Sequence, residues 1–153
     1  MKTILIISDS HGNIKGVDEL LPRIAENDFV IHLGDGAADM RTARSLYPEK
    51  VYACAGNCDF YSPLPLDGEL EAEQIKIYYC HGHRYSVKSG LDLLAEEAKR
   101  RGCEIALYGH THEAKISVVD GVTLINPGSM HYSRAYCYLV VNKDKFTPVL
   151  VGE

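Results

Sequence analysis

Five short apolar runs along this chain each end just before a residue that could bind a metal ion. The runs, each with the polar residues that follow it, are 4–7 with Asp9 and His11, 29–33 with Asp35, 51–55 with Asn57, 75–80 with His81, and 105–108 with His110 and His112. Short apolar runs bounded by glycine or aspartate are typical of buried strands. In open α/β sheets the ligand site lies beyond the carboxyl ends of the strands. We therefore expect these side chains to converge on one edge of a sheet.

The length of the chain predicts a single domain, and its charge disfavours long nucleic acid as a partner. A chain of 153 residues is expected to form one domain, 1–153, with a hydrophobic core of its own. It has 16 Lys and Arg against 21 Asp and Glu, a formal net charge of −5. Because long nucleic acid is bound through many phosphate contacts from basic residues, we expect no such partner, and a nuclease is disfavoured. A small phosphate ester drawn in by metal ions is compatible with an acidic protein.

The cysteine pattern indicates a reducing compartment. The five cysteines show no CxxC spacing, and Cys54, Cys80 and Cys137 lie inside apolar runs, as small core residues do. The N-terminus enters a strand directly, without a signal-peptide pattern, and no apolar stretch has transmembrane length. We therefore expect a soluble cytoplasmic protein that does not act at a membrane.

The first half of the chain alternates predicted strands and helices. Strands are expected at 2–8, 29–34 and 50–55, and helices at 14–26 and 37–47. Pro22 is placed to begin a second short helix within 14–26. The helix at 37–47 would have one face made of Met40, Ala43, Leu46 and Tyr47. This alternation predicts parallel strands joined by right-handed crossovers.

The middle of the chain predicts an extended segment at 68–80 and then a helix at about 90–101. Ser89 is placed to cap this helix, with Asp92 three residues later. Its buried stripe would be Leu91, Leu94, Ala95 and Ala98. The one basic cluster, residues 99–101, falls at the negative end of the helix dipole, before the terminator Gly102.

The last third changes character and predicts two antiparallel hairpins. Asp120-Gly121 is a strong two-residue turn signal between strands 115–119 and 122–125. Residues 142–145 would join strands 135–141 and 146–151. Parallel strands early and hairpins late favour two mixed sheets packed face to face, with helices outside.

The candidate ligands form motifs that are weak singly and specific together. Asp9-Ser10-His11, Gly34-Asp35 and Gly56-Asn57-Cys58-Asp59 could each be an ordinary turn. Two His-x-His pairs, 81–83 and 110–112, are harder to explain as turn chemistry. The series in this order, each member at a strand end, indicates a metal site.

The motif series D-x-H, G-D, G-N-x-D, H and G-H-x-H resembles the calcineurin-like metallophosphoesterase superfamily. With its short length and the segment Asn126-Pro127-Gly128-Ser129, the chain most resembles the small YfcE-like phosphodiesterases. The resemblance covers residues 8 to 129. It implies an α/β fold, a four-layer α/β/β/α sandwich of two mixed sheets.

The resemblance also implies a dinuclear site. Asp9, His11 and His112 would hold one metal ion, Asn57, His81 and His110 the other, and Asp35 would bridge both. Nitrogen and oxygen ligands without thiolate suit Mn²⁺, Fe or Zn²⁺, and sometimes Ni²⁺, and of these Mn²⁺ is the expected ion. In such sites the two ions share a hydroxide that attacks phosphorus, so that a small phosphate ester is hydrolysed without a protein nucleophile. The residues expected to take part in catalysis are Asn57, Cys58 and His110.

Cys58 departs from the pattern of many superfamily members, which carry histidine there to assist the leaving group. Because a thiol is a poorer donor to a leaving alkoxide, slow hydrolysis of unactivated esters is expected. The YfcE-like branch shares departures of this kind, so the resemblance implies phosphodiesters rather than general monoesters. Asp59 beside it is expected to hold the loop, the alternative being a general acid.

Several neighbouring residues have two interpretations. His83 and Arg84 either meet the substrate phosphate or lie in a solvated loop, and His32 is expected in the core or just behind the ligands. Two further residues, His131 and Tyr132, could line the pocket. Asn126-Pro127-Gly128 is expected to form a tight turn under the site, and Asn13 to cap the first helix.

A non-catalytic function on the same fold is the alternative. The scaffold subunit of the retromer complex resembles this family yet works through protein contacts, with an impaired metal site. In this chain all seven ligand positions of the motif carry a residue that can bind metal, which favours the enzyme. Tyr132, Tyr136 and Tyr138 could supply a docking patch or could pack a sheet. A homo-oligomer is compatible with either function.

Overall fold

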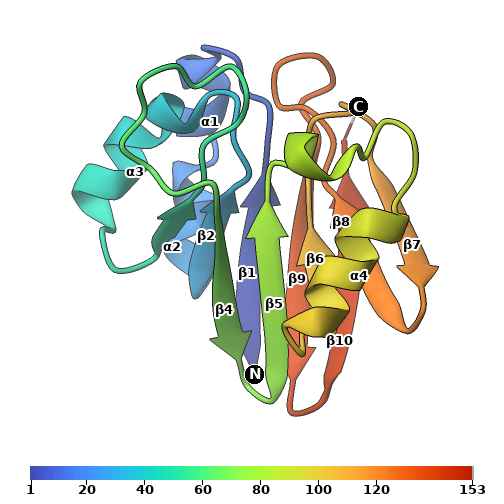
Figure 1. Ribbon diagram of the computed structural model, residues 1–153. Coiled ribbons are helices and arrows are strands. Elements are labelled where there is room, and N and C mark those ends of the chain that lie inside the picture. The colour runs from blue at the N-terminus through green and yellow to red at the C-terminus, as the bar shows by residue number, and fades with distance from the viewer. Residues whose placement is uncertain (153) are drawn as a thin grey trace.

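The N-terminal strand lies at the centre of one mixed sheet with strand order β10-β9-β1-β2-β3 (Figure 1). The structure is a computed structural model that describes residues 1–152. The strands of this sheet are β1 (Lys2–Ile7), β2 (Phe29–His32), β3 (Val51–Ala53), β9 (Tyr136–Asn142) and β10 (Lys145–Val151). The first three are parallel, and the C-terminal hairpin pairs antiparallel with β1. The predicted parallel first half and antiparallel end are confirmed.

The second sheet has the order β4-β5-β6-β8-β7. Its strands are β4 (Asp67–Ala72), β5 (Ile75–Cys80), β6 (Ile105–Leu107), β7 (Lys115–Val119) and β8 (Val122–Asn126). The three inner strands are parallel, and each edge strand is antiparallel to its neighbour. The extended segment expected at 68–80 is thus two strands joined by a turn. Asp120 and Gly121 both have positive φ, 49° and 81°, as a two-residue hairpin turn that follows strand twist requires.

Side chains that alternate between the two faces of the central strands place each sheet between the central core and a layer of helices. Ile4 and Ile6 of β1 belong to a buried cluster with Ile77 and Ile105 of the second sheet. Leu5, in contrast, packs with residues of the helices that cover the first sheet. Because successive strand residues point to opposite faces, each sheet has one face in the central core and one under helices. The predicted four-layer α/β/β/α sandwich is confirmed.

Short helices cover the first sheet: α1 (Ile14–Asp18), α2 (Leu21–Glu26), the 3₁₀ helix η1 (Ala37–Met40) and α3 (Arg41–Leu46). Pro22 lies in the first turn of α2, and the Asn13 side chain accepts a hydrogen bond from Gly16 N at 3.0 Å, both as predicted. Met40, Ala43 and Tyr47 pack in one cluster, but Leu46 is 58% exposed, so the prediction that all four residues share one face is wrong for Leu46. The 3₁₀ turn before α3 has three residues per turn and rotates the later residues relative to one continuous α-helix.

The second sheet is covered by α4 (Asp92–Arg100), preceded by the 3₁₀ helix η2 (His83–Tyr85). Its buried stripe includes Leu94, Ala95 and Ala98, as predicted. The cap prediction is wrong: the residue before the helix is Leu91, which makes no side-chain cap, and Ser89 lies two residues too early. Among the described residues, no helix is long and apolar enough to cross a membrane.

Candidate metal centre

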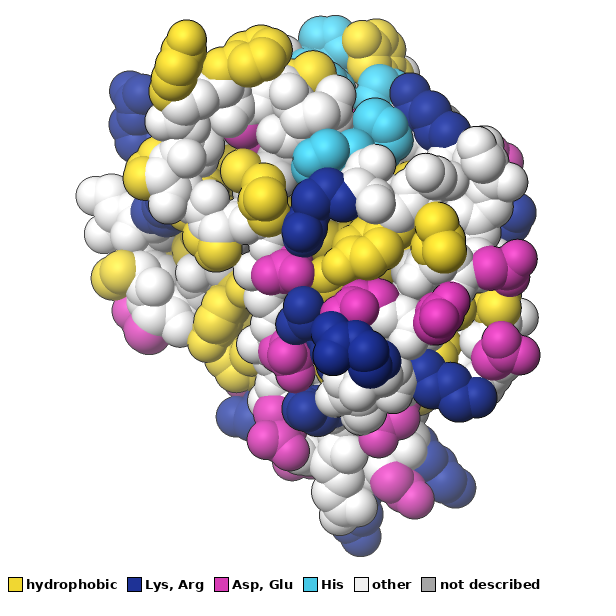
Figure 2. All heavy atoms as spheres, viewed as in Figure 1, with side chains coloured by type: hydrophobic (Ala, Val, Ile, Leu, Met, Phe, Trp, Pro, Cys, Tyr) yellow, Lys and Arg dark blue, Asp and Glu magenta, His cyan; other side chains and the backbone are white. Residues whose placement is uncertain are grey.

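Histidines and acids from distant parts of the chain meet where the parallel strands of both sheets end. Figure 2 shows the histidines gathered at this end of the molecule. His11 and His112 approach to 3.3 Å between their Nε2 atoms, and His81 Nε2 lies 3.2 Å from His110 Nδ1. The predicted convergence of strand ends is therefore present, and six of the seven predicted ligands fall into two adjoining groups.

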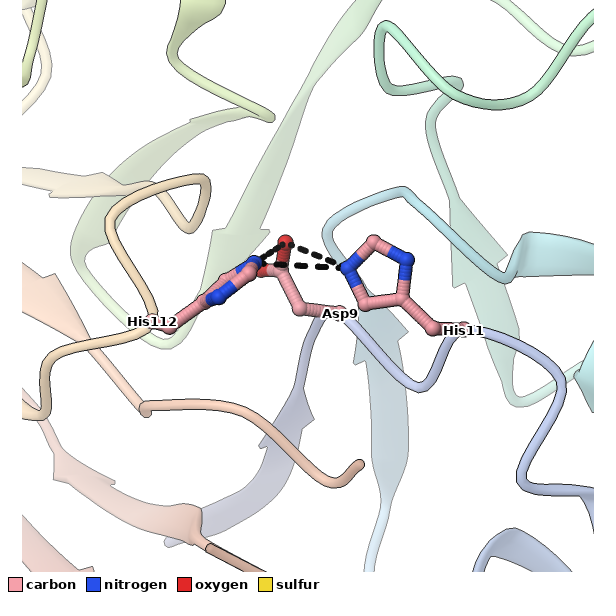
Figure 3. Close-up of side chains that lie close together, drawn as sticks. All are labelled: Asp9, His11 and His112. Atoms are coloured by element: carbon pink, nitrogen blue, oxygen red, sulfur yellow. Dashed lines mark hydrogen bonds and ion pairs between the residues drawn. The ribbon is translucent and has the colours of Figure 1, made fainter. Parts of the chain in front are cut away.

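The first group is Asp9, His11 and His112 (Figure 3), whose ligand atoms lie within 4.8 Å of one another. His112 Nε2 is 3.1 Å and His11 Nε2 is 3.6 Å from Asp9 Oδ1. Asp9 is fully buried, and within residues 1–152 its Oδ1 has no hydrogen-bond partner. Because a buried carboxylate oxygen without a partner is costly, a cation between it and the two imidazoles fits this group.

The second group is Asp35, His81 and His110. His81 is fully buried, and its Nδ1 donates to Leu33 O at 2.8 Å, which leaves Nε2 facing Asp35 Oδ2 at 3.2 Å. Burial disfavours the ionised form of Asp35, but in the metal-free protein a protonated His81 and the hydrogen bond from the Cys58 N–H outweigh it and hold the pKa of Asp35 well below its usual range. A cation bound to His81 Nε2 would take the place of that proton. A carboxylate kept ionised beside an oriented imidazole suits a divalent cation.

Asn57 and Cys58 lie beside these groups on an exposed loop. Cys58 N donates to Asp35 Oδ1 at 2.7 Å, and the thiol forms a third possible ligand group with His11 and Asp35. Burial, then the charge of Asp35, raises the pKa of the Cys58 thiol. The Asn57 amide nitrogen faces Cys58 Sγ at 3.7 Å. The role of Asn57 as a metal ligand stays a prediction.

Left-handed backbone conformations are concentrated in the candidate ligands. Positive φ values occur at Asp9 (52°), His11 (43°), Asp35 (57°), His110 (71°) and His112 (62°). Each such conformation costs on the order of 1–3 kcal/mol in a residue with a side chain, and such costs are typical of functional sites. The packing around them requires glycine: a Cβ on Gly109 would lie 2.5 Å from Asp9 Oδ2, and one on Gly56 would lie 2.2 Å from Asp35 Oδ1.

The Asp59 carboxylate joins the two loops that carry Asp35 and Asn57. Its Oδ2 accepts from Asp35 N at 2.7 Å and from Gly56 N at 2.8 Å, and its Oδ1 accepts from Gly36 N at 2.8 Å. All of these contacts hold backbone rather than face the centre. The predicted role of Asp59 in holding the loop is confirmed.

A buried chain of polar groups stands behind the first group. Gly34 N donates to His32 Nδ1 at 3.0 Å, so the His32 proton is on Nε2, which faces Ser10 Oγ at 2.9 Å. Ser10 in turn donates to Asp39 Oδ2 at 2.7 Å. Burial lowers the pKa of His32 to about 4, in keeping with a neutral ring. His32 was predicted here, but Ser10 and Asp39 were missed, because nothing in the sequence relates residues so far apart.

The rim of the centre is aromatic. Tyr132 stacks on His112 with ring centroids 4.9 Å apart, and His131 lies edge-on to His11 at 6.1 Å. Both predicted pocket residues therefore line the site. His83 lies 5.5 Å from the His81 ring, whereas Arg84 pairs with Asp67 at 3.2 Å. Arg84 is thus held by an acid rather than turned to the centre.

The loop of Asn126-Pro127-Gly128 lies under the site, as predicted. Asn126 is fully buried and donates to Gly109 O at 3.2 Å and to Thr111 Oγ1 at 2.9 Å, next to the candidate ligands His110 and His112. Its own Oδ1 accepts from Gly128 N at 2.9 Å. The amide thus fixes the loop of the second His-x-His pair.

Comparison with known families agrees with this geometry. Residues 1–145 match the calcineurin-like phosphoesterase superfamily domain. The chain belongs to this superfamily. It is 35% identical over 150 residues to the probable metallophosphoesterase YsnB of Bacillus subtilis, covering 94% of this chain and 87% of that protein. A probable metallophosphoesterase of Mycoplasma genitalium is 30% identical over 163 residues, covering 99% and 94% of the two chains.

Solved structures share the fold. A predicted phosphoesterase of Streptococcus pneumoniae superposes with a TM-score of 0.83 at 26% identity, covering 99% of this chain and 89% of that one. Vps29 of Chaetomium thermophilum superposes with a TM-score of 0.81 at 18% identity, covering 99% and 86%. The second likeness concerns the fold alone. The resemblance to metallophosphoesterases inferred from the motifs is confirmed.

Proposed function

We propose that this superfamily member is a dinuclear metal-dependent phosphodiesterase that hydrolyses a small phosphate ester. The observation that carries the proposal is the buried Asp9 Oδ1, which lacks a hydrogen-bond partner within residues 1–152 and has imidazole nitrogens around it. The names of the curated relatives support phosphoester hydrolysis. We further infer that residues 1–153 act as one metallophosphoesterase domain.

The division of ligands follows the two groups. Asp9, His11 and His112 would hold one ion, and His81 and His110, with Asn57, the other. Asp35 is suited to bridge them, because its Oδ2 lies 3.2 Å from His81 Nε2 and 4.0 Å from His11 Nε2, one histidine of each group. Nitrogen and oxygen ligands without thiolate are compatible with Mn²⁺, Zn²⁺, Fe and Ni²⁺, and of these we propose Mn²⁺.

Two divalent ions in this site would supply an activated water and neutralise the charge of the phosphoryl oxygens. The protein's own residues would hold those ligands in place and orient the ester. The Cys58 thiol lies near His11 and Asp35 and would face the leaving group in this proposal, but a neutral thiol is a weak donor. The chain is therefore suited to esters whose leaving groups need little protonation.

The location is part of this proposal. All five cysteines are free thiols, and four of them are buried. Free buried thiols are typical of proteins in a reducing compartment, which supports the cytoplasm.

The second candidate function is a non-catalytic protein-binding scaffold. It is favoured by the shared fold with Vps29 and by Phe60 and Tyr61, which are 78% and 104% exposed on the loop after Asn57. Exposed aromatic residues of this kind are typical of protein contacts. Two observations count against it: every predicted ligand position carries a ligand residue, and five of these candidate ligands have a costly left-handed backbone, which a protein that binds only through its surface does not need.

The deciding experiment is hydrolysis of bis-p-nitrophenyl phosphate by chelator-stripped protein, with and without added Mn²⁺. We expect metal-dependent turnover that Asp9→Asn abolishes while the circular dichroism spectrum is retained. Absence of turnover with Mn²⁺, Zn²⁺, Fe²⁺ and Ni²⁺ would overturn the enzyme and turn the search to a protein partner.

A further inference from the structure

A hollow of about 400 Å³ lies beside the candidate metal centre, since the candidate ligand His11 is in its wall. It is lined by His11, Gly12, Asn13, His131 and Arg134. A second hollow of about 330 Å³ is lined by Arg23 and Glu19 among others, and Arg134 lines both hollows. One arginine therefore borders both the hollow that contains His11 and a second cavity.

The guanidinium group of Arg134 is unengaged within residues 1–152. No hydrogen bond or ion pair in that part of the chain involves it, whereas Arg84 and Arg101 both pair with Asp67. The backbone of Arg134 is left-handed, with φ 48°, a conformation that glycine or asparagine adopts at lower cost. Local conformation thus does not explain an arginine here.

The loop that carries Arg134 is fixed to the strand end that carries Asp9. Met130 N donates to Ser8 O at 3.0 Å, and Ser129 Oγ donates to Asp9 O at 2.8 Å. Ala135 N, directly after Arg134, donates to Ser129 O at 3.2 Å. Because both sides of the loop are tied to the ligand strand, the position of Arg134 relative to the centre is set by the fold.

Arg23 is oriented in the same wall. Its Nη1 donates to Tyr138 Oη at 3.1 Å, and its guanidinium lies 5.9 Å from the centre of the Tyr136 ring. Glu19 is the acidic side chain of that hollow, so two cations face one anion there. Among residues 1–152, the side chains that line the second hollow thus carry more positive than negative charge, on a protein with a net charge of −5.

We propose that Arg134, with Arg23 behind it, binds a second phosphate group carried by the alcohol part of the substrate. The preferred substrates are then phosphodiesters in which an esterified alcohol bears a further phosphate. This inference rests on the proposed function, because the scissile phosphate is placed at the metal centre. Arginine suits the role, since its planar fork of donors matches phosphate oxygens.

The test compares two chromogenic esters that differ only in the second phosphate: the p-nitrophenyl ester of thymidine 5′-phosphate and its 3′-phosphorylated counterpart. We expect the Mn²⁺-loaded protein to prefer the second. Arg134→Gln should lower kcat/KM for that ester about tenfold to a hundredfold, mostly through KM, and leave the first within about twofold. Arg134→Lys should restore part of the loss. Arg100→Gln, an exposed arginine at the far end of α4, is the matched control and should leave both unchanged.

The outcomes separate the two proposals. Equal rates for the two esters, or an equal loss on both in Arg134→Gln, would overturn the role of Arg134 and leave the phosphodiesterase standing. Without turnover of either ester, calorimetry with thymidine 3′,5′-bisphosphate and thymidine 5′-phosphate decides. Tighter binding of the bisphosphate that Arg134→Gln removes would support the anion site although the enzyme failed, and equal binding would overturn both.

Discussion

Asp59 offers a sharp test of how the candidate centre is held together, because one carboxylate accepts hydrogen bonds from three backbone N–H groups. They belong to Asp35, Gly36 and Gly56, at 2.7 to 2.8 Å. Hydrogen bonds to a charged group contribute about 1.5–3 kcal/mol each. Asp59 is half-buried, so water takes over part of the loss in Asp59→Ala, and we expect the free energy of unfolding to fall by about 3–4 kcal/mol.

Asp59→Asn tests the loss of one hydrogen bond without the loss of side-chain volume. Its single carboxamide oxygen can replace Oδ2 and keep the bonds to Asp35 and Gly56, which loses only the bond to Gly36, and we expect a cost of about 1–2 kcal/mol. The assay is urea unfolding followed by circular dichroism with excess chelator, since bound metal would add stability by mass action. Asp144→Ala, an exposed turn residue, is the control. A loss below about 1 kcal/mol in Asp59→Ala would refute the reasoning.

Three further predictions concern pH, metal content and the leaving group. Burial lowers the pKa of His32 to about 4, below its ordinary value of about 6.5 in the unfolded chain. The unfolded state thus binds more protons than the folded state in this pH interval. The free energy of unfolding of the metal-free protein should therefore decrease by at most about 3 kcal/mol as the pH falls from about 6.5 to about 4. If the dependence of this free energy on pH is the same in His32→Gln, the prediction is contradicted. Asp35→Asn should lose both metal ions together, as measured by metal analysis after dialysis, and retention of one ion would argue against a bridge. Cys58→His should leave metal content unchanged and raise turnover of esters with poor leaving groups, because an imidazolium is the better donor; loss of metal would instead place Cys58 among the ligands.

Local sequence patterns predicted much of the fold. The apolar runs marked the parallel strands, Asp120-Gly121 marked a hairpin, and the stripe of α4 marked its buried face. These signals survive because each depends on residues close in sequence. Two predictions failed because the exact start and rotation of a helix were not fixed by these local signals. Ser89 does not cap α4, because the helix begins at Asp92. Leu46 is exposed, because a 3₁₀ turn changes the rotation of α3.

The candidate ligands could also be identified from the sequence. The residue type shows which side chains can bind metal, and the carboxyl ends of parallel strands meet at one edge of a sheet. Six of the seven do come together. What the sequence alone determined is therefore which side chains gather and at which edge. The tertiary structure decided how they are held: the left-handed backbone at Asp9 and Asp35, the three bonds to Asp59, and the place of Arg134 beside His11. Each of these depends on segments distant in the chain packing against one another, and no local pattern of residues encodes such a contact.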